Sequence, residues 1–451
     1  MHTDSQITRW RRNAGAPQAA SFTASSNALP FRALMAFTFF LLISPQSFFP
    51  VLAPLRIALI TAIVAVCAHL FDRFVRRRPF MEFSREIIIA ACILGWAVLT
   101  VPLSYWPGGS VSYLVNMFAK TLIVFWLLTQ LVNTLPRLKF VIWSLSLIAI
   151  PLALSGVMNL IVGNFAQPGL ALNESRIVGY DAPLTANPND LALTLNLILP
   201  LSISLFLASK KPGIRALLLA CICLDAIGVV ATYSRGGFLT LAVTVGIYLF
   251  TLLKRRHEQH WVLLALFLIV AALPFLPAGY VDRLSTITDI ESDTSGSAQA
   301  RWGDTIAALG YVLFHPIIGA GLGMNMLALN EVRGPTWTEI HNVYLQYAMD
   351  LGIPGLILFL MLLIGTIKNM RLVQRLSTAA RNWDLFYLAE GIRVSLIAFA
   401  VAAFFHPVGY HFYFYYIAGL AVATKAISIA GADKTTVGDT VPPRVPMRRL
   451  G

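Results

Sequence analysis

Long apolar runs separated by short polar segments dominate this chain. Most runs approach the roughly 20 residues that a helix needs to cross about 30 Å of hydrocarbon. No long stretch alternates with a period of two residues, which is the pattern of a β-barrel. The pattern therefore predicts about twelve membrane-spanning helices, near residues 33–50, 54–71, 86–103, 112–132, 140–162, 190–208, 215–232, 237–253, 261–278, 342–366, 386–405 and 411–428.

The connections and chain ends differ in length. Residues 1–30 and 429–451 are polar and predict disordered cytoplasmic tails, which leaves residues 31–428 as one membrane domain. Two connections are long, near residues 163–189 and 279–341. Loops of this length in a compact protein are usually functional or disordered. The second contains aromatic and apolar residues, so we expect it to form an ordered helical cap on an all-α, polytopic membrane protein.

Composition excludes several classes of protein. The 451 residues are 57% hydrophobic and only 12% charged, whereas soluble domains carry about 25% charged residues. A soluble chain of this length would lack the polar residues needed to cover its surface. The composition therefore excludes a cytosolic enzyme, a disordered protein and a small disulfide-rich secreted protein, and it indicates the lipid bilayer as the surroundings of the chain.

Positive charge follows the predicted topology. The chain carries 34 Lys and Arg against 21 Asp and Glu, a net charge of +13. A nucleic-acid-binding protein would gather such charge on one soluble face, but here the cations lie in short clusters between apolar runs. With both termini cytoplasmic, 26 of the 34 cations fall in cytoplasmic segments. The positive-inside rule therefore predicts cytoplasmic N and C termini, and the charge gives no reason to expect a nucleic-acid partner.

Eight cations fall outside those cytoplasmic segments and need another explanation. Arg393 is near a cytoplasmic helix end, from which its side chain can reach the interface. Arg56 and Lys120 either line the bundle interior or reach the interface. The other five fall in predicted external connections, where a function is the natural explanation: Arg176, Arg235, Arg283, Arg301 and Arg333.

Several of these arginines accompany a histidine that opens the tenth apolar run. His341 is predicted at the external mouth of a helix, where partial desolvation suits a histidine to general-base chemistry. Arg235 follows a tight turn between two runs, Arg301 lies in the long loop, and Arg176 precedes the sixth run. The planar guanidinium group matches phosphate oxygens, so arginines facing one histidine predict a diphosphate site beside a base.

Each of these residues also has a structural interpretation. His341 at an interface can simply hydrogen-bond to a loop carbonyl, and Arg235 can reach lipid headgroups from its turn. The other two arginines have acidic neighbours that offer loop ion pairs instead, namely Asp304 or Glu331 for Arg301 and Glu174 or Asp181 for Arg176.

Three motifs occur in order between predicted helices: Ser234-Arg235-Gly236, Arg301-x₁₃-His315-Pro316 leading to Gly319-x-Gly321-x-Gly323, and His341-Asn342-x-x-Leu345 followed by Gly352-x-x-Gly355. Together they resemble the O-antigen ligase and polymerase superfamily of bacterial inner membranes. The resemblance is specific between about residues 170 and 360, and it covers the remainder only as a helix count. It implies a GT-C-like fold with its site at the periplasmic face.

The resemblance implies glycosyl transfer without a metal or other cofactor. The donor in the family is a glycan on undecaprenyl diphosphate, and the acceptor is a hydroxyl of the lipid A-core or of a second glycan. Carried over to this chain, His341 would be the catalytic base, and Arg235 and Arg301 would hold the diphosphate. The further candidates for substrate binding are Arg176, Asn342, Trp302 and Tyr344. Trp302 has an alternative interpretation as part of an interfacial aromatic belt.

Other functions stay open. A polysaccharide polymerase would use the same base and arginines with a lipid-linked repeat unit as acceptor, and a ligase directed at a pilin is a third option. No sequence feature separates them. A transporter of lipid-linked sugars would perform no chemistry, but its charges would lie near the bilayer midplane, whereas these gather at one face. No external Asp/Glu cluster has obvious metal-ligand spacing, which agrees with a metal-free reaction. The one group that could contradict this is Asp289, Glu291 and Asp293.

Overall fold

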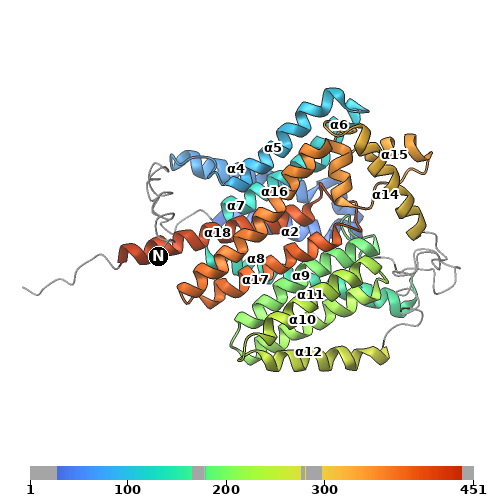
Figure 1. Ribbon diagram of the computed structural model, residues 1–451. Coiled ribbons are helices and arrows are strands. Elements are labelled where there is room, and N and C mark those ends of the chain that lie inside the picture. Colours follow the sequence, from blue (N-terminus) through green and yellow to red (C-terminus); the bar gives the residue numbers. More distant parts are fainter. Residues whose placement is uncertain (1–27, 165–176, 178, 276–279, 281–296, 439–451) are drawn as a thin grey trace, which may run out of the picture.

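A computed structural model describes residues 28–164, 177, 179–275, 280 and 297–438 of the chain. Helices make up most of these ranges, and no β-strand occurs within them. The helices run roughly side by side and form one bundle, with two shorter helices at one end (Figure 1). The predicted all-α fold is therefore confirmed.

The part of the bundle before residue 165 begins with a helical pair and ends with a long helix. The 3₁₀ segments η1 (Pro50–Leu55) and η2 (Val101–Leu103) adjoin α4 and α5, and a π-helical segment, η3 (Leu114–Phe118), joins α6 to α7. The α-helices are α2 (Ala28–Ile43), α3 (Pro45–Phe48), α4 (Ile57–Val75), α5 (Arg85–Thr100), α6 (Pro107–Tyr113), α7 (Ala119–Leu131) and α8 (Leu135–Val162).

The rest of the bundle contains the most deeply buried helices. A short 3₁₀ segment, η4 (Leu273–Phe275), follows α12. The α-helices are α9 (Pro188–Ala208), α10 (Pro212–Ala231), α11 (Arg235–Leu253), α12 (Gln259–Ala272), α14 (Ser297–Phe314), α15 (Asn325–Arg333), α16 (Val343–Ala379), α17 (Trp383–Ala402) and α18 (Phe412–Gly438).

Every predicted apolar run overlaps one of these helices. Within the described ranges, ten helices are long and apolar enough to cross a membrane, so the prediction of a polytopic membrane protein is confirmed. Two further apolar helices are shorter, α2 with 16 residues and α12 with 14. A straight helix of that length falls short of the ~20 residues that a crossing requires.

Helix α9 is the centre of the bundle. Its apolar span is almost wholly buried, and it packs against α8, α10, α11 and α17. Helices approach closely in a membrane where small residues lie between them. Gly391 of α17 faces α9 in this way, because a Cβ there would lie 2.7 Å from the carbonyl oxygen of Pro200 and 2.6 Å from the Cβ of Ser204.

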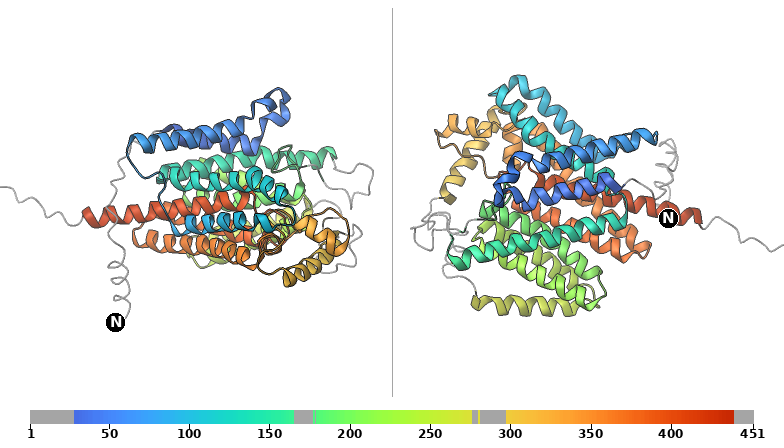
Figure 2. Two further views of the ribbon diagram at one scale, coloured as in Figure 1. Left: turned by 90° about the horizontal axis from the view of Figure 1, so that it is seen from above. Right: turned by 180° about the vertical axis from the view of Figure 1, so that it is seen from behind.

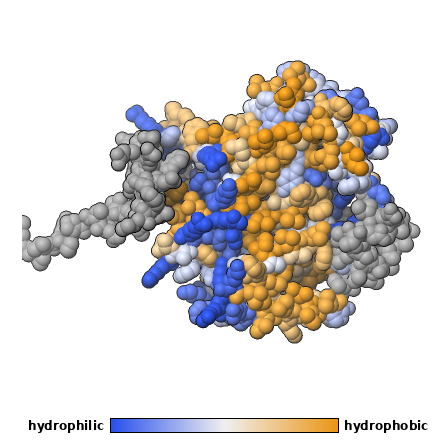
Figure 3. Space-filling view, viewed as in Figure 1, coloured by the Kyte–Doolittle hydropathy of each residue, from blue (hydrophilic) through white to orange (hydrophobic). Residues whose placement is uncertain are grey.

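Hydrophobic side chains also cover the outside of the bundle. They occupy the middle of the face shown in Figure 3, and a hydrophilic band borders them on one side. Helices α4 and α12 lie at the periphery (Figures 1 and 2), and large apolar side chains on both are exposed, such as Phe71 and Phe267. Such a surface is typical of a bundle that is surrounded by lipid.

The two ends of the bundle differ. The described chain begins and ends at one end, which we term the tail end, and α14 and α15 lie at the opposite end, which we term the cap end (Figure 1). The cap has a small apolar core of its own, built around Ala308, Leu329 and Met349. The expected helical cap is thus present in residues 297–341. The remainder of the predicted loop and nearly all of the predicted N-terminal tail lie outside the described residues.

The contact at Gly391 predicts a stability effect. Replacing Gly391 with Val should lower the free energy of unfolding by about 1–3 kcal/mol, because the added side chain meets the α9 backbone in a packed interior. Thermal unfolding of the detergent-purified protein measures this. Gly365→Val in α16 is the matched control, since no atom lies within 4 Å of a Cβ placed there. Equal melting temperatures for the two variants would contradict the packing account.

Candidate active site at the cap end

Helix ends from distant parts of the chain meet at the cap end. The Ser234 hydroxyl donates a 2.8 Å hydrogen bond to the Asn189 side-chain oxygen, joining the starts of α11 and α9. An imidazole nitrogen of His406, after α17, lies 3.1 Å from the Asn189 carbonyl oxygen. The Val343 N–H at the start of α16 donates to the carbonyl oxygen of Ala403 at 2.7 Å. The predicted site segments are therefore joined by side-chain and backbone hydrogen bonds.

The turn before α11 fixes the position of Arg235. Ser234 caps the helix by accepting a 3.2 Å hydrogen bond from the Gly237 N–H. Gly236 and Gly237 lie so close to their neighbours that a Cβ would meet Phe405 at 2.9 Å and Ala192 at 2.8 Å. The small residues thus let the turn pack between α9 and α17. Arg235 is the first residue of α11 and is half-buried, at a helix terminus whose N–H groups favour anions.

His341 has a defined tautomer in this structure. Its Nδ1 lies 3.0 Å from the carbonyl oxygen of Glu339. A carbonyl oxygen only accepts hydrogen bonds, so Nδ1 carries the hydrogen. In the neutral ring, the lone pair that can accept a proton is therefore on Nε2.

The surroundings of His341 keep it neutral. Burial lowers its pKa to about 4, and the positive charge of Arg301 acts in the same direction, with smaller effects of His406 and Arg333. The hydrogen bond to Glu339 opposes them only in part. The structure therefore brings His341 and Arg301 close enough to interact electrostatically. Burial also raises the pKa of the neighbouring Glu339 carboxyl group.

Asn342 and Tyr344, predicted to bind substrate, contact other parts of the protein. The side-chain oxygen of Asn342 caps α16, accepting hydrogen bonds from the N–H groups of Tyr344 at 2.9 Å and Leu345 at 3.1 Å. The Tyr344 hydroxyl donates a 2.7 Å hydrogen bond to the carbonyl oxygen of Ala400. Its ring packs 4.7 Å from that of Phe404. These contacts hold the start of α16 on α17, and substrate contacts of the two residues stay predictions.

The remaining predicted residues are placed differently. Trp302 follows Arg301 on α14, and its side chain is 60% exposed. Arg176 lies outside the described residues, as does Arg283. Asp304, considered above as an ion-pair partner of Arg301, is paired with Arg333. Arg333 also donates to the backbone and side-chain oxygens of Thr338 at 2.9 and 2.8 Å. It therefore joins α14 to the segment that leads to His341.

An asparagine and an aspartate that the sequence analysis did not single out hold the segment that leads to His341. Asn325 and Asp350 are both buried. The Asp350 carboxylate accepts hydrogen bonds from the Asn325 backbone N–H at 2.8 Å and from its side-chain amide at 3.2 Å. The Asn325 side-chain oxygen in turn accepts a 3.2 Å hydrogen bond from the N–H of Ile340. The two residues thus fix the backbone directly before His341. The one sequence signal for this contact was Asp350 itself, an acidic residue inside a predicted membrane span, where such residues are rare.

The glycine-rich loop docks on a break in α16. Gly352 interrupts that helix with a φ of 68°, and a Cβ there would lie 2.1 Å from the Ile317 carbonyl oxygen. The N–H groups of Ala320 and Gly321 donate to the carbonyl oxygens of Met349 and Asp350 at 2.6 and 2.9 Å. The glycines therefore allow close backbone pairing. They do not have the context of a nucleotide-binding loop, since the described residues directly before them, 297–318, contain a helix and no strand.

His406 is a second histidine that the sequence did not assign to the site. It is buried, and its Nδ1 and Nε2 face the carbonyl oxygens of Ala402 at 3.0 Å and Asn189 at 3.1 Å. A carbonyl oxygen only accepts hydrogen bonds, so a ring nitrogen that bonds to either of them carries a hydrogen. In its charged form, His406 lowers the pKa of His341.

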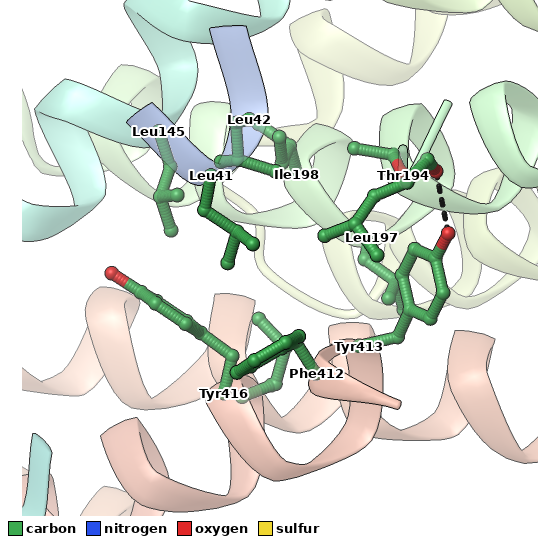
Figure 4. A pocket seen from close by; sticks show the side chains of 11 residues that line it. Leu41, Leu42, Leu145, Thr194, Leu197, Ile198, Phe412, Tyr413 and Tyr416 are labelled. Atoms are coloured by element: carbon green, nitrogen blue, oxygen red, sulfur yellow. Dashed lines mark hydrogen bonds between the residues drawn. The ribbon is translucent and has the colours of Figure 1, made fainter. Parts of the chain in front are cut away.

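An apolar cavity lies between α2, α8, α9 and α18, apart from these residues. It holds about 50 Å³, and its lining includes Leu41, Leu145, Ile198 and Tyr416. A hydrogen bond joins Tyr413 to Thr194 at its edge (Figure 4). A cavity of this kind suits hydrocarbon, and none of the predicted site residues lines it.

Within the described ranges, no group of three His, Cys, Asp or Glu side chains is arranged to hold a metal ion. Asp289, Glu291 and Asp293, the acidic group noted in the sequence, lie outside those ranges.

The Asn325–Asp350 contact predicts a large stability effect. Asp350→Ala would leave the buried donors of Asn325 without an acceptor and should cost about 1–3 kcal/mol or more in unfolding free energy. Glu331→Ala, which removes an exposed acid from the same cap, should change it by no more than about 0.5 kcal/mol. Thermal unfolding of both purified variants measures the difference, and a wild-type melting temperature for Asp350→Ala would show that the contact is unimportant.

Residues 216–360 of the chain match the family model described as O-antigen ligase. No curated protein matches the chain. The matched range begins within α10 and ends within α16, so it contains Arg235, Arg301, Asn325, His341 and Asp350. The start of α9 and the end of α17, with Asn189 and His406, lie outside it.

Proposed function

We propose that this chain is a glycosyltransferase of the O-antigen ligase and polymerase superfamily, a proposal supported by the match of residues 216–360 to the family model described as O-antigen ligase. It transfers a glycan from undecaprenyl diphosphate to a hydroxyl of the lipid A-core. The observation that carries the proposal is a neutral histidine with a free Nε2, close to the charge of Arg301, at one end of a membrane bundle.

In this proposal, the cap end faces the periplasm of a bacterial inner membrane. The described chain begins and ends at the tail end (Figure 1), and most cations fall in connections that the positive-inside rule assigns to the cytoplasm. The hydrophilic band in Figure 3 lies toward the same end. A donor that is flipped across the membrane would then meet His341 on the periplasmic side.

The reaction is a direct displacement. The Nε2 atom of His341 takes the proton of the acceptor hydroxyl, and the acceptor oxygen forms a bond to the anomeric carbon of the donor. The bond from that carbon to the diphosphate oxygen breaks, and undecaprenyl diphosphate leaves with the electron pair. Attack from the opposite side inverts the anomeric configuration. The proton on His341 then passes to solvent.

The cations would bind the donor and stabilise its leaving group. Arg301 and Arg235 can each present a planar fork to phosphate oxygens, and the first N–H groups of α11 favour the same charge. Charge that develops on the leaving diphosphate is stabilised by groups that are already fixed in place. We include Arg176, Trp302, Asn342 and Tyr344 in the proposal as further substrate contacts.

Donor binding would also strengthen the base. In the empty site, the positive charge of Arg301 helps to lower the pKa of His341. A bound diphosphate offsets that charge and raises the pKa of His341 toward neutrality, where a general base is more effective. The same groups therefore serve binding and proton transfer.

A polymerase would use the same groups with a different acceptor. The two activities are separated by supplying purified protein in vesicles with labelled lipid-linked glycan and either lipid A-core or a second lipid-linked unit. Label on lipid A-core identifies a ligase, and a ladder of lipid-linked chains identifies a polymerase. A transporter would move the glycan without forming either product.

His341→Ala should lower the transfer rate by about 10²–10⁴-fold, which is the usual contribution of a positioned base. The reconstituted transfer assay measures the loss, and a monodisperse size-exclusion peak shows that the variant is folded. The control is His315→Ala, which removes an exposed histidine of the same cap whose ring stacks on Tyr311 at 4.3 Å. Unchanged transfer by His341→Ala would refute its role as base.

The pH profile should report the pKa of His341. Because the base must be neutral, kcat/KM of the free enzyme should be lost as the pH falls through about 4. The acid limb of kcat should lie at higher pH, since bound diphosphate raises the pKa.

A charge variant tests the same assignment. Arg301→Gln removes a positive charge that lowers the pKa of His341, so the acid limb of kcat/KM should move to higher pH. Arg56→Gln, which replaces an exposed cation before α4, should leave the limb in place. A limb that stays fixed in Arg301→Gln would mean that another group titrates.

A further inference from the structure

One face of α14 is apolar and exposed. From Trp302 onward, the exposed side chains of this helix are all hydrophobic, apart from a glycine at 303. The first four follow one another at helical spacings of three and four, and Phe314 adjoins the last of them. Their exposed fractions are large: Trp302 60%, Ile306 56%, Leu309 50%, Leu313 79% and Phe314 85%. An exposed apolar patch of this kind normally marks an interaction surface.

Two polar side chains of the same helix, Asp304 and Tyr311, lie on its packed face. Asp304 is buried and paired with Arg333 of α15, and Tyr311 is buried beside Ala308 and Val312. A helix that faces water shows the reverse arrangement, with charge outside and apolar residues inside. The outer face of α14 therefore suits an apolar environment.

The exposed face adjoins a lipid-facing surface. The end of α14 is held to α16 by a 2.7 Å hydrogen bond from the Ile353 N–H to the Pro316 carbonyl oxygen. Ile317, 62% exposed, continues the apolar surface at this point. Exposed apolar residues then follow down the membrane-spanning part of α16 at spacings of four, four and three: Ile353, Ile357, Met361 and Ile364.

We propose that α14 lies in the membrane interface at the cap end, with this face against the hydrocarbon of the adjacent leaflet. Continuity with the lipid-facing surface of α16 identifies the bilayer as the occupant. Trp302, at the far end of the face, has the residue type that is enriched at membrane–water interfaces. An amphipathic helix with one large apolar face binds the interface in this manner.

This placement has a consequence that rests on the proposed function. Arg301 directly precedes Trp302, so it would lie at the level of the lipid headgroups. A donor anchored by its lipid tail carries its diphosphate at the same level. Arg301 would then meet the diphosphate at the membrane surface, and the lipid contact of α14 would help to align the two.

Spin labelling of the full-length protein tests the lipid contact without any substrate. The native cysteines at 67, 92, 221 and 223 are replaced, and a nitroxide is attached to Leu309→Cys or, in a second variant, Leu313→Cys. Thr336→Cys is the control, because Thr336 is an exposed polar residue of the same cap. The probes are oxygen, which concentrates in lipid, and a nickel chelate, which stays in water. The proteins are placed in vesicles of phosphatidylethanolamine and phosphatidylglycerol.

Labels at 309 and 313 should collide more with oxygen than with the nickel chelate, and the label at 336 should show the opposite order. Equal access of the chelate to all three sites would overturn the proposal. If both reagents are excluded from the labels at 309 and 313, and the spectra are broadened by labels on neighbouring copies, a second copy of the chain covers this face. That result would also overturn the proposal. The two positions are one helical turn apart, and only monodisperse variants are compared. A failed transfer assay would leave this result untouched.

Discussion

Helix α16 does not continue regularly to the cap end, because Gly352, with a φ of 68°, breaks it. The break makes the carbonyl oxygens of Met349 and Asp350 available to accept hydrogen bonds from the glycine-rich loop. It also brings the Asp350 carboxylate to Asn325, which holds the N–H of Ile340 directly before His341. The position of His341 therefore depends on a helix break at Gly352, further along the chain.

His341 must be neutral to accept a proton, and it must also be basic enough to hold that proton. Burial and the cations nearby keep it neutral in the empty site, which leaves Nε2 able to accept a proton but makes it a weak base. Those cations are the groups suited to an anionic donor, so in the proposed reaction the substrate itself removes part of the effect. His406, after α17, lowers the pKa of His341 in the same direction when it is charged. In the proposed reaction, the pKa of His341 therefore depends on whether the anionic donor is bound.

The sequence predicted most of the fold because apolar periodicity and length decide where a chain crosses a membrane. Each predicted run overlaps a helix, and α2 and α12 are shorter because each ends two residues before a proline, Pro45 and Pro274, which interrupts α-helical hydrogen bonding. Local patterns also singled out as candidates His341 and Arg301, which the structure brings close enough to interact electrostatically. They could not reveal Asn325 with Asp350, or Asn189 with His406, because these partners are far apart in sequence and meet only through tertiary packing. Nor could they show that Asn342 and Tyr344 make contacts with α16 and α17.

Anomeric configuration tests the central claim most directly, namely that a neutral His341 activates an acceptor for direct displacement at a membrane-bound diphosphate. A purified, reconstituted protein is given a lipid-linked glycan of known anomeric configuration, and the linkage in the product is determined by NMR from the coupling constant of its anomeric proton. The account predicts an inverted linkage. A retained configuration would contradict it, because retention requires a glycosyl-enzyme intermediate that a single displacement does not form.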